Sequence, residues 1–162
     1  MRVVVADTGP VHYLLLIGQI GILHRLFEKI IIPSAVCAEL LRPETPNDVR
    51  IWMQQPPSWL EIRAPQSADP PEASLDGLDD GEQAALVLAG VLNADLLLLD
   101  DRDGVRAARL RGFRVIGTRR VLQLASKRGF LDLADSFDRI KRTNFRYRQE
   151  IMDELIREMG DA

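Results

Sequence analysis

The chain has 162 residues, 46% of them apolar and 28% charged, with a formal net charge of −3. This composition is typical of one soluble globular domain and excludes a disordered chain. The single cysteine, Cys37, excludes an internal disulfide framework and a cysteine-rich zinc site. The apolar run at the N-terminus is short and meets Asp7, which fits neither a signal peptide nor a membrane span. We therefore expect a cytoplasmic protein with no membrane contact.

Five short apolar runs alternate with segments of helical periodicity. The runs predict β-strands at 3–6, 30–32, 59–63, 96–99 and 113–116. The periodic segments predict one long or two short helices over 11–27, and further helices from 33 onward and at 47–54, 79–92, 105–111, 118–127, about 131–142 and 147–159. Residues 64–76 are rich in Pro, Ser, Ala and Asp, which predicts a surface loop.

This alternation predicts a single α/β domain with helices layered on a mostly parallel sheet. Ligands of such folds bind outside the carboxyl ends of the strands. Asp7 follows the first predicted strand and Asp100 follows the fourth, so two distant segments point to one edge of the sheet.

Charge is unevenly distributed along the sequence. Residues 1–100 carry 6 lysines and arginines against 14 acids, whereas residues 101–162 carry 15 against 10. Segments of opposite net charge in one domain suit an acidic pocket beside a basic rim, which is an arrangement for binding and cutting a polyanion. Solvated helix faces that pair with one another would give the same counts.

Three aspartates follow apolar runs directly. Asp7 fits a metal ligand, and it equally fits the N-cap of the next helix. Asp100 and Asp101 follow four leucines and would repel each other without a cation between them. Asp103 is expected either to cap the following helix or to hold an outer-shell water.

Two glutamates lie within predicted helices. Glu39 lies beyond the first helical turn, where neither capping nor the helix dipole explains it, although a solvated glutamate is common there. Glu82 follows Asp79 in the D-x-x-E pattern of a capping box, and capping and metal chemistry are both open to it.

Three arginines recur after the acidic pair at intervals of four and three residues: Arg102, Arg106 and Arg109. This spacing places them on one helical face, where they would bind phosphates leading to the acids. The alternative is a solvated stripe that forms salt bridges with neighbouring helices.

The segments VVADTGP, IIIPSAVCAEL, LDDGEQAALVLA, LLLLDDRDG and FRVIGT, in this order, resemble the PIN domain family of metal-dependent ribonucleases, and especially a branch close to VapC-type toxins. The resemblance covers Arg2 to about Gly129. It implies a PIN-like three-layer α/β fold in one domain over 1–162, with a core of about 1–129 and a C-terminal helical extension of about 130–162.

Carried over by position, the resemblance implies four catalytic acids, each also a metal ligand: Asp7, Glu39, Glu82 and Asp101. Asp100 is a further metal-ligand candidate, and Thr8 would orient Asp7 or a water. Leu99 occupies a position where family members commonly have Thr or Ser, which leaves the choice between Asp100 and Asp101 open. Carboxylate oxygens favour Mg²⁺ or Mn²⁺.

The expected function is a Mg²⁺- or Mn²⁺-dependent endoribonuclease, potentially the toxin of a toxin-antitoxin pair, with RNA as substrate, an antitoxin protein as partner and a homodimeric state. The alternative is a PIN-like module that binds RNA or a partner without cutting. A receiver-type signalling domain is disfavoured because the last strand ends in Ile116-Gly117-Thr118, without the lysine that such domains need.

Overall fold

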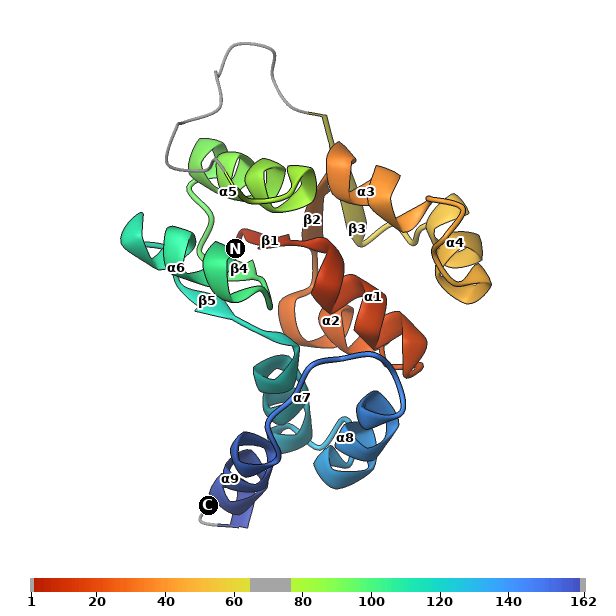
Figure 1. The fold of residues 1–162 in the computed structure, drawn as a ribbon, viewed down its shortest axis with the longest axis vertical. Coiled ribbons are helices and arrows are strands. Elements are labelled where there is room, and N and C mark those ends of the chain that lie inside the picture. Colours follow the sequence, from red (N-terminus) through yellow and green to blue (C-terminus); the bar gives the residue numbers. More distant parts are fainter. Residues whose placement is uncertain (1, 65–76, 161–162) are drawn as a thin grey trace.

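A computed structural model describes residues 2–64 and 77–160 of the chain (Figure 1). The predicted loop at 64–76 therefore lies outside the described residues, except for Ala64. None of the helices in the described ranges has the length and apolar character needed to cross a bilayer.

The strands of the described residues form one sheet in which every pairing is parallel. They are β1 (Val4–Ala6), β2 (Ile30–Pro33), β3 (Leu60–Arg63), β4 (Leu96–Leu98) and β5 (Val115–Ile116). Their order is β3-β2-β1-β4-β5, so β1 lies at the centre. Each predicted strand is present, within two residues at its ends.

Nine helices lie within the described residues. They are α1 (Thr8–Leu16), α2 (Gly21–Phe27), α3 (Ser34–Leu40), α4 (Asn47–Gln54), α5 (Asp80–Leu92), α6 (Arg102–Leu110), α7 (Thr118–Lys127), α8 (Leu133–Lys141) and α9 (Gln149–Gly160). Of the two alternatives for residues 11–27, two short helices form, and Gly18 with a positive φ of 73° separates them.

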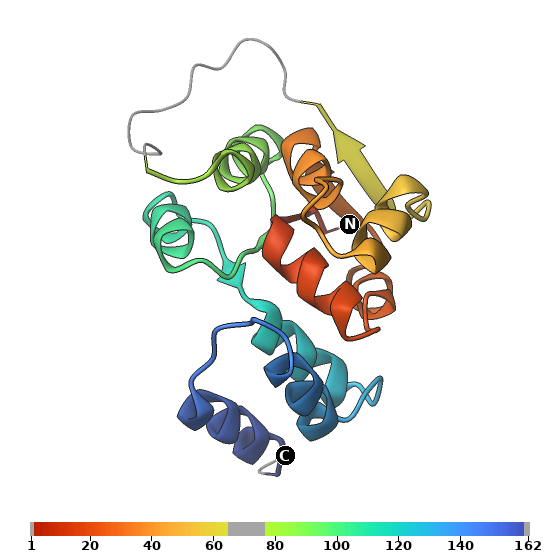
Figure 2. The ribbon, with the colours of Figure 1, turned by 45° about the vertical axis from the view of Figure 1, so that its right-hand side comes forward.

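Alternate strand residues bury themselves against opposite helical layers, because successive side chains of a strand point to opposite faces. Val4 and Ala6 belong to the core shared with α1, α2, α4 and α7. Val5 and Leu97 belong to the second core, shared with α5 and α6. The fold is thus the predicted three-layer α/β sandwich, with the sheet between helices (Figures 1 and 2).

The last helices pack into the larger core. Phe137 of α8 and Met152 of α9 are buried there together with α7 residues such as Leu122. The buried amide of Gln123 on α7 donates to the Leu155 carbonyl oxygen at 3.1 Å, which holds α9 against α7. Figure 2 shows α7, α8 and α9 grouped at the end of the molecule away from α5.

The topology defines where a ligand can enter. Strands β1 and β4 are neighbours, with Ala6 opposite Leu98. The chain continues from β1 toward β2 on one side, and from β4 toward β5 on the other. Connections that leave in opposite directions open a crevice at the carboxyl ends of the two strands. The segments that begin at Asp7 and Leu99 border this crevice.

Candidate active site

Asp7 lies at the carboxyl end of the central strand, immediately after β1. Its backbone N–H donates to the Leu98 carbonyl oxygen at 2.9 Å, which fixes the residue beside β4. Asp7 is the N-cap residue of α1, but its side chain makes no capping hydrogen bond. The side chain is only 6% exposed, and its Oδ1 has no hydrogen-bond partner among the described residues. Helix capping therefore does not explain the carboxyl group.

The environment of Asp7 favours its neutral form. The pKa of Asp7 is raised from 3.8 to about 7, and burial is the largest cause. The Thr8 amide lowers the pKa in part, and the negative charges of Asp79, Glu39 and Asp100 contribute to its rise. The carboxyl of Asp7 thus lies among other acids and carries an unsatisfied oxygen.

Glu39 connects the starts of two helices. Its Oε2 accepts a hydrogen bond from the Thr8 hydroxyl at 2.5 Å, and its Oε1 accepts one from the Gly81 N–H at 2.9 Å. A β-carbon at position 81 would lie 2.5 Å from Oε1, so Gly81 is needed for this contact. The Thr8 hydroxyl, predicted to orient Asp7 or a water, is bonded to Glu39 instead.

Glu82 is buried near the start of α5, with 8% of its surface exposed. Its N–H donates to Asp79 Oδ1 at 2.8 Å, so Asp79 is the N-cap that the sequence indicated. Burial raises the pKa of Glu82, and the charges of Asp79, Asp101 and Asp7 raise it further. The Glu82 carboxyl therefore faces the same group of acids as Asp7.

Asp100 is held rigidly by one residue. The Thr118 N–H donates to its Oδ1 at 2.7 Å, and the Thr118 hydroxyl donates to its Oδ2 at 2.6 Å. The carboxylate also fits closely between two glycines, since a β-carbon at Gly117 would lie 2.6 Å from Oδ1 and one at Gly9 would lie 3.2 Å from Oδ2. Burial raises the pKa of Asp100, while the Thr118 bonds and the Arg119 charge lower it.

Asp101 caps α6. Its Oδ2 accepts from the N–H groups of Asp103 and Gly104 at 3.1 and 3.2 Å. The helix therefore begins at Arg102 and not at the predicted residue 105. The expectation that Asp103 caps this helix was wrong, because Asp103 supplies a donor to the cap.

The predicted acids thus gather at one edge of the sheet. Asp7 is influenced by the charges of Glu39 and Asp100, and Glu82 by those of Asp101 and Asp7. Asp79 influences both Asp7 and Glu82, although the sequence indicated only capping for it.

The chemistry of this group fits a hard divalent cation. Every candidate donor is a carboxylate oxygen, which Mg²⁺ and Mn²⁺ prefer, and Asp7 Oδ1 is buried without a partner. Within 2–64 and 77–160, no set of three or more His, Cys, Asp or Glu side chains is already spaced to hold one metal ion. Both carboxylate oxygens of Glu39 and of Asp100, and Oδ2 of Asp101, are instead engaged in internal hydrogen bonds.

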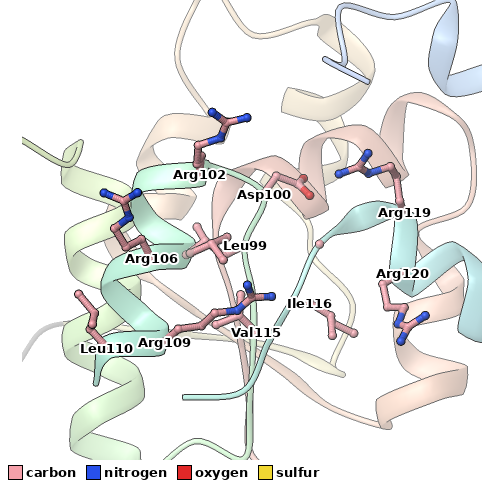
Figure 3. A pocket seen from close by; sticks show the side chains of 12 residues that line it. Leu99, Asp100, Arg102, Arg106, Arg109, Leu110, Val115, Ile116, Arg119 and Arg120 are labelled. Atoms are coloured by element: carbon pink, nitrogen blue, oxygen red, sulfur yellow. The ribbon is translucent and has the colours of Figure 1, made fainter. Parts of the chain in front are cut away.

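A basic groove adjoins the acids, between α6 and the start of α7 (Figure 3). It is an open cavity of about 810 Å³. The predicted arginines line the α6 wall, and two further arginines come from α7: Arg102, Arg106, Arg109, Arg119 and Arg120. Asp100 lies at the end of the groove that meets the acidic edge, and Gly117 lines the groove beside Asp100.

Sequence reasoning missed two contributors to this region. Thr118 is fully buried and holds Asp100 from 18 residues further along the chain. The sequence feature that marks Thr118 is the Gly117-Thr118 pair directly after the last apolar run, from which only the start of a helix was predicted. The second is Arg119, which lies outside the predicted arginine stripe of α6, because its position opposite α6 depends on how the chain passes from β5 to α7.

A parallel sheet with carboxylates at its central switch point defines the class of protein: an α/β domain with an acidic ligand site. A family model described as a PIN domain matches residues 3–161. The chain therefore belongs to the PIN domain family, which includes nucleases, and the resemblance noted in the sequence is confirmed.

Solved structures support the fold. The chain is similar to a PilT N-terminus domain protein from the hyperthermophilic archaeon Sulfolobus solfataricus P2, with 21% sequence identity and a TM-score of 0.53. The match covers 91% of this chain and 100% of that protein. At this identity the likeness shows the fold alone. No curated protein matches the sequence.

Proposed function

We propose that the chain is a PIN-type endoribonuclease that hydrolyses RNA phosphodiester bonds with Mg²⁺ or Mn²⁺. The observation that carries the proposal is Asp7, a buried carboxyl with an unpaired Oδ1 at the switch point of the sheet, surrounded by other acids. A buried acid with no partner destabilises a fold. Such groups are concentrated at functional sites.

In this proposal the cation would be held by Asp7, Glu39, Glu82 and one or both of Asp100 and Asp101. When bound, it would supply the positive charge that lowers the pKa of a water and stabilises the attacked phosphate. The protein groups do the rest. Asp7 and Glu82 give up the protons that their raised pKa values favour. Glu39 accepts hydrogen bonds from the Thr8 hydroxyl and the Gly81 N–H, and so connects the starts of α1 and α5. Thr118 keeps Asp100 oriented.

A second candidate is a PIN module that binds RNA or a partner without cutting. The observation in its favour is that both carboxylate oxygens of Glu39 and of Asp100, and Oδ2 of Asp101, already accept hydrogen bonds within the fold. These acids would then be structural, whereas the buried carboxyls of Asp7 and Glu82 would be unexplained. The proposal further includes a toxin role, restraint by an antitoxin and a homodimeric state, which rest on the resemblance to VapC-type toxins, and a cytoplasmic location, which rests on the short apolar run at the N-terminus.

Cleavage of a mixed RNA pool tests the proposal. Purified protein is incubated with Mg²⁺ or Mn²⁺ and compared with Asp7→Asn, Asp100→Asn and Asp101→Asn, and with the exposed control Asp138→Asn. We expect metal-dependent cutting in the parent and the control, and a loss of about 100-fold or more in Asp7→Asn. The weaker of the other two variants identifies the fourth acid.

The contrary results are equally distinct. RNA binding without cutting at every metal concentration favours the passive module. Cutting that survives EDTA, or that Asp7→Asn retains in full, contradicts a metal-dependent site at this edge.

A further inference from the structure

The connection between α8 and α9, residues 142–148, is fixed to the body of the domain. It crosses over the start of α7 in both views of the ribbon (Figures 1 and 2). Phe145 of this connection is buried and belongs to the larger core. Its N–H donates to the Thr143 hydroxyl oxygen at 3.1 Å, and that hydroxyl donates to the Ile140 carbonyl oxygen at 2.6 Å. The connection is therefore anchored both to the core and to the end of α8.

Two contacts join this connection to α1. The Tyr13 hydroxyl of α1 donates to Asn144 Oδ1 at 2.9 Å. The Tyr13 ring packs edge-on against Phe145, with the ring centroids 4.9 Å apart and the ring planes at 82°. The C-terminal extension is thus bound to the helix that directly follows Asp7.

Tyr13 in turn lies on the side of α1 that meets Asp100. Gly9 and Tyr13 are four residues apart and share one face of the helix. A β-carbon at Gly9 would lie 3.2 Å from Asp100 Oδ2. Long side chains of a helix lean toward its N-terminus, which directs Tyr13 toward Gly9. The pKa of Tyr13 agrees with this position: burial raises it most, the negative charge of Asp100 raises it further, and the positive charge of Arg146 lowers it.

Arg146 is a cation that the fold itself does not use. Its side chain is exposed, and within the described residues it forms no ion pair and no hydrogen bond. The two residues before it, Asn144 and Phe145, are fixed to Tyr13, so the charge of Arg146 is held near the acidic edge. Arg146 does not line the basic groove and comes to the edge from another part of the chain. A guanidinium in this place is suited to a phosphate oxygen.

We propose that Arg146 contacts the phosphate held at the acidic edge, so that the C-terminal extension completes the active site. The proposal rests on the proposed function for the cation and for the ligand, an RNA phosphodiester, but it does not require that the chain cuts RNA. Tyr13, Asn144 and Phe145 are positioning residues, because they hold the connection from which Arg146 extends.

RNA binding measured without cleavage is the first test. The full chain is titrated in Ca²⁺ against a fluorescein-labelled single-stranded RNA of about 12 nucleotides, and fluorescence anisotropy is followed at several salt concentrations. Gel electrophoresis verifies that the RNA stays intact. The variants are Arg146→Gln, Arg146→Lys and the matched control Arg148→Gln, an exposed arginine of the same connection that forms no ion pair in the described part of the chain. Thermal unfolding verifies that each variant is folded.

We expect Arg146→Gln to bind the RNA about fivefold more weakly than the parent. Its salt slope should fall by roughly 0.7, the loss of one phosphate contact of a single strand. Arg146→Lys should keep most of the affinity, because it keeps the charge. Arg148→Gln should change the affinity by less than about twofold.

Mn²⁺ binding distinguishes a phosphate contact from a structural role. A positive charge near the acids opposes the binding of a cation, so Arg146→Gln should bind Mn²⁺ as tightly as the parent or up to about threefold more tightly. A variant that loosened the acids would bind Mn²⁺ more weakly. Tyr13→Phe keeps the ring and removes the hydrogen bond to Asn144, so it should weaken RNA binding about twofold and leave Mn²⁺ binding unchanged.

Three results would overturn the proposal. The first is RNA binding by Arg146→Gln that equals that of Arg148→Gln. The second is weaker Mn²⁺ binding by Arg146→Gln than by the parent, which would show that Arg146 supports the acids and does not touch the phosphate. The third is the absence of Mn²⁺ binding by the parent. A parent that cuts no RNA, with the binding results as expected, would count against the proposed function and not against this contact.

Discussion

The carboxyl group of Asp7 does not stabilise the fold. The group is buried, one oxygen lacks a partner within the described residues, and neighbouring acids oppose its ionisation. An asparagine of nearly the same shape would avoid the charge. Residues that cost stability in this way are expected where function requires them.

The pH dependence of stability follows from this burial. The pKa of Asp7 is about 7 in the folded protein and 3.8 ordinarily, so between these values the folded state binds more protons than the unfolded state. The stabilisation is complete below the ordinary pKa and is lost as the pH rises through about 7. In EDTA, we expect the parent to lose roughly 2–4 kcal/mol between about pH 4 and pH 8.

Asp7→Asn should remove the share of that loss contributed by Asp7 and leave the share contributed by Glu82, whose pKa is also raised, to about 8. Urea unfolding at several pH values measures the effect, with the exposed Asp138→Asn as control. Identical pH profiles for Asp7→Asn and the parent would show that Asp7 is ionised freely in the fold.

The roles of the two adjacent aspartates were beyond sequence reasoning. Asp100 turns inward to Thr118, and Asp101 turns outward to cap α6. The difference is set by the backbone as it leaves β4 and by a partner 18 residues away. A sequence shows two acids in a row but not which of them a distant hydroxyl will hold.

At the scale of elements, helix starts build the site. Asp7, Asp79 and Asp101 are the N-cap residues of α1, α5 and α6, and Asp100 accepts from the first N–H of α7. Helix N-termini carry partial positive charge, which makes crowded carboxylates less costly there. The fold therefore supplies part of the charge compensation that a cation would complete.

Substitution of Gly81 tests the contact by which Glu39 of α3 meets the start of α5. In Gly81→Ala the new methyl would meet Glu39 Oε1, so the glutamate must leave the Gly81 N–H. The lost hydrogen bond costs about 1 kcal/mol. The gain in helix propensity is about 1 kcal/mol. We expect nearly unchanged thermal stability but RNA cleavage reduced about tenfold, measured on the same preparation.

The matched control is Gly90→Ala in the same helix, where the nearest atom to a new β-carbon is Phe113 Cζ at 4.0 Å. Its cleavage should equal that of the parent. If Gly81→Ala also cuts at the parental rate, the position of Glu39 is irrelevant to activity.

Most elements could be predicted because burial on both faces leaves continuous apolar runs and helices leave periodic ones. Helices α4 and α7 match their predicted bounds, whereas α6 begins three residues early. Its first turn, Arg102 to Gly104, contains no large apolar residue, so periodicity could not reveal it. The structure shows this turn to be helical, with Asp101 as its N-cap.

For the whole molecule, the division of charge along the sequence becomes a division in space. The acidic edge comes from α1, α3, α5 and the end of β4, and the basic groove from α6 and α7. The two regions meet at Asp100 and Gly117. This adjacency could be predicted because the arginine stripe begins directly after Asp101 in the sequence, but the second wall of the groove could not, because it depends on where α7 lies after β5.

Calorimetric titration with Mn²⁺ tests most directly whether the acidic edge is a metal centre. At about pH 6.5, in buffers of different ionisation enthalpy, we expect saturable binding to the parent with release of about one proton or more, because metal binding requires ionised carboxylates. Asp7→Asn should bind at least tenfold more weakly and release fewer protons. Absence of saturable binding, or equal binding and proton release in both proteins, would contradict a metal centre built on Asp7.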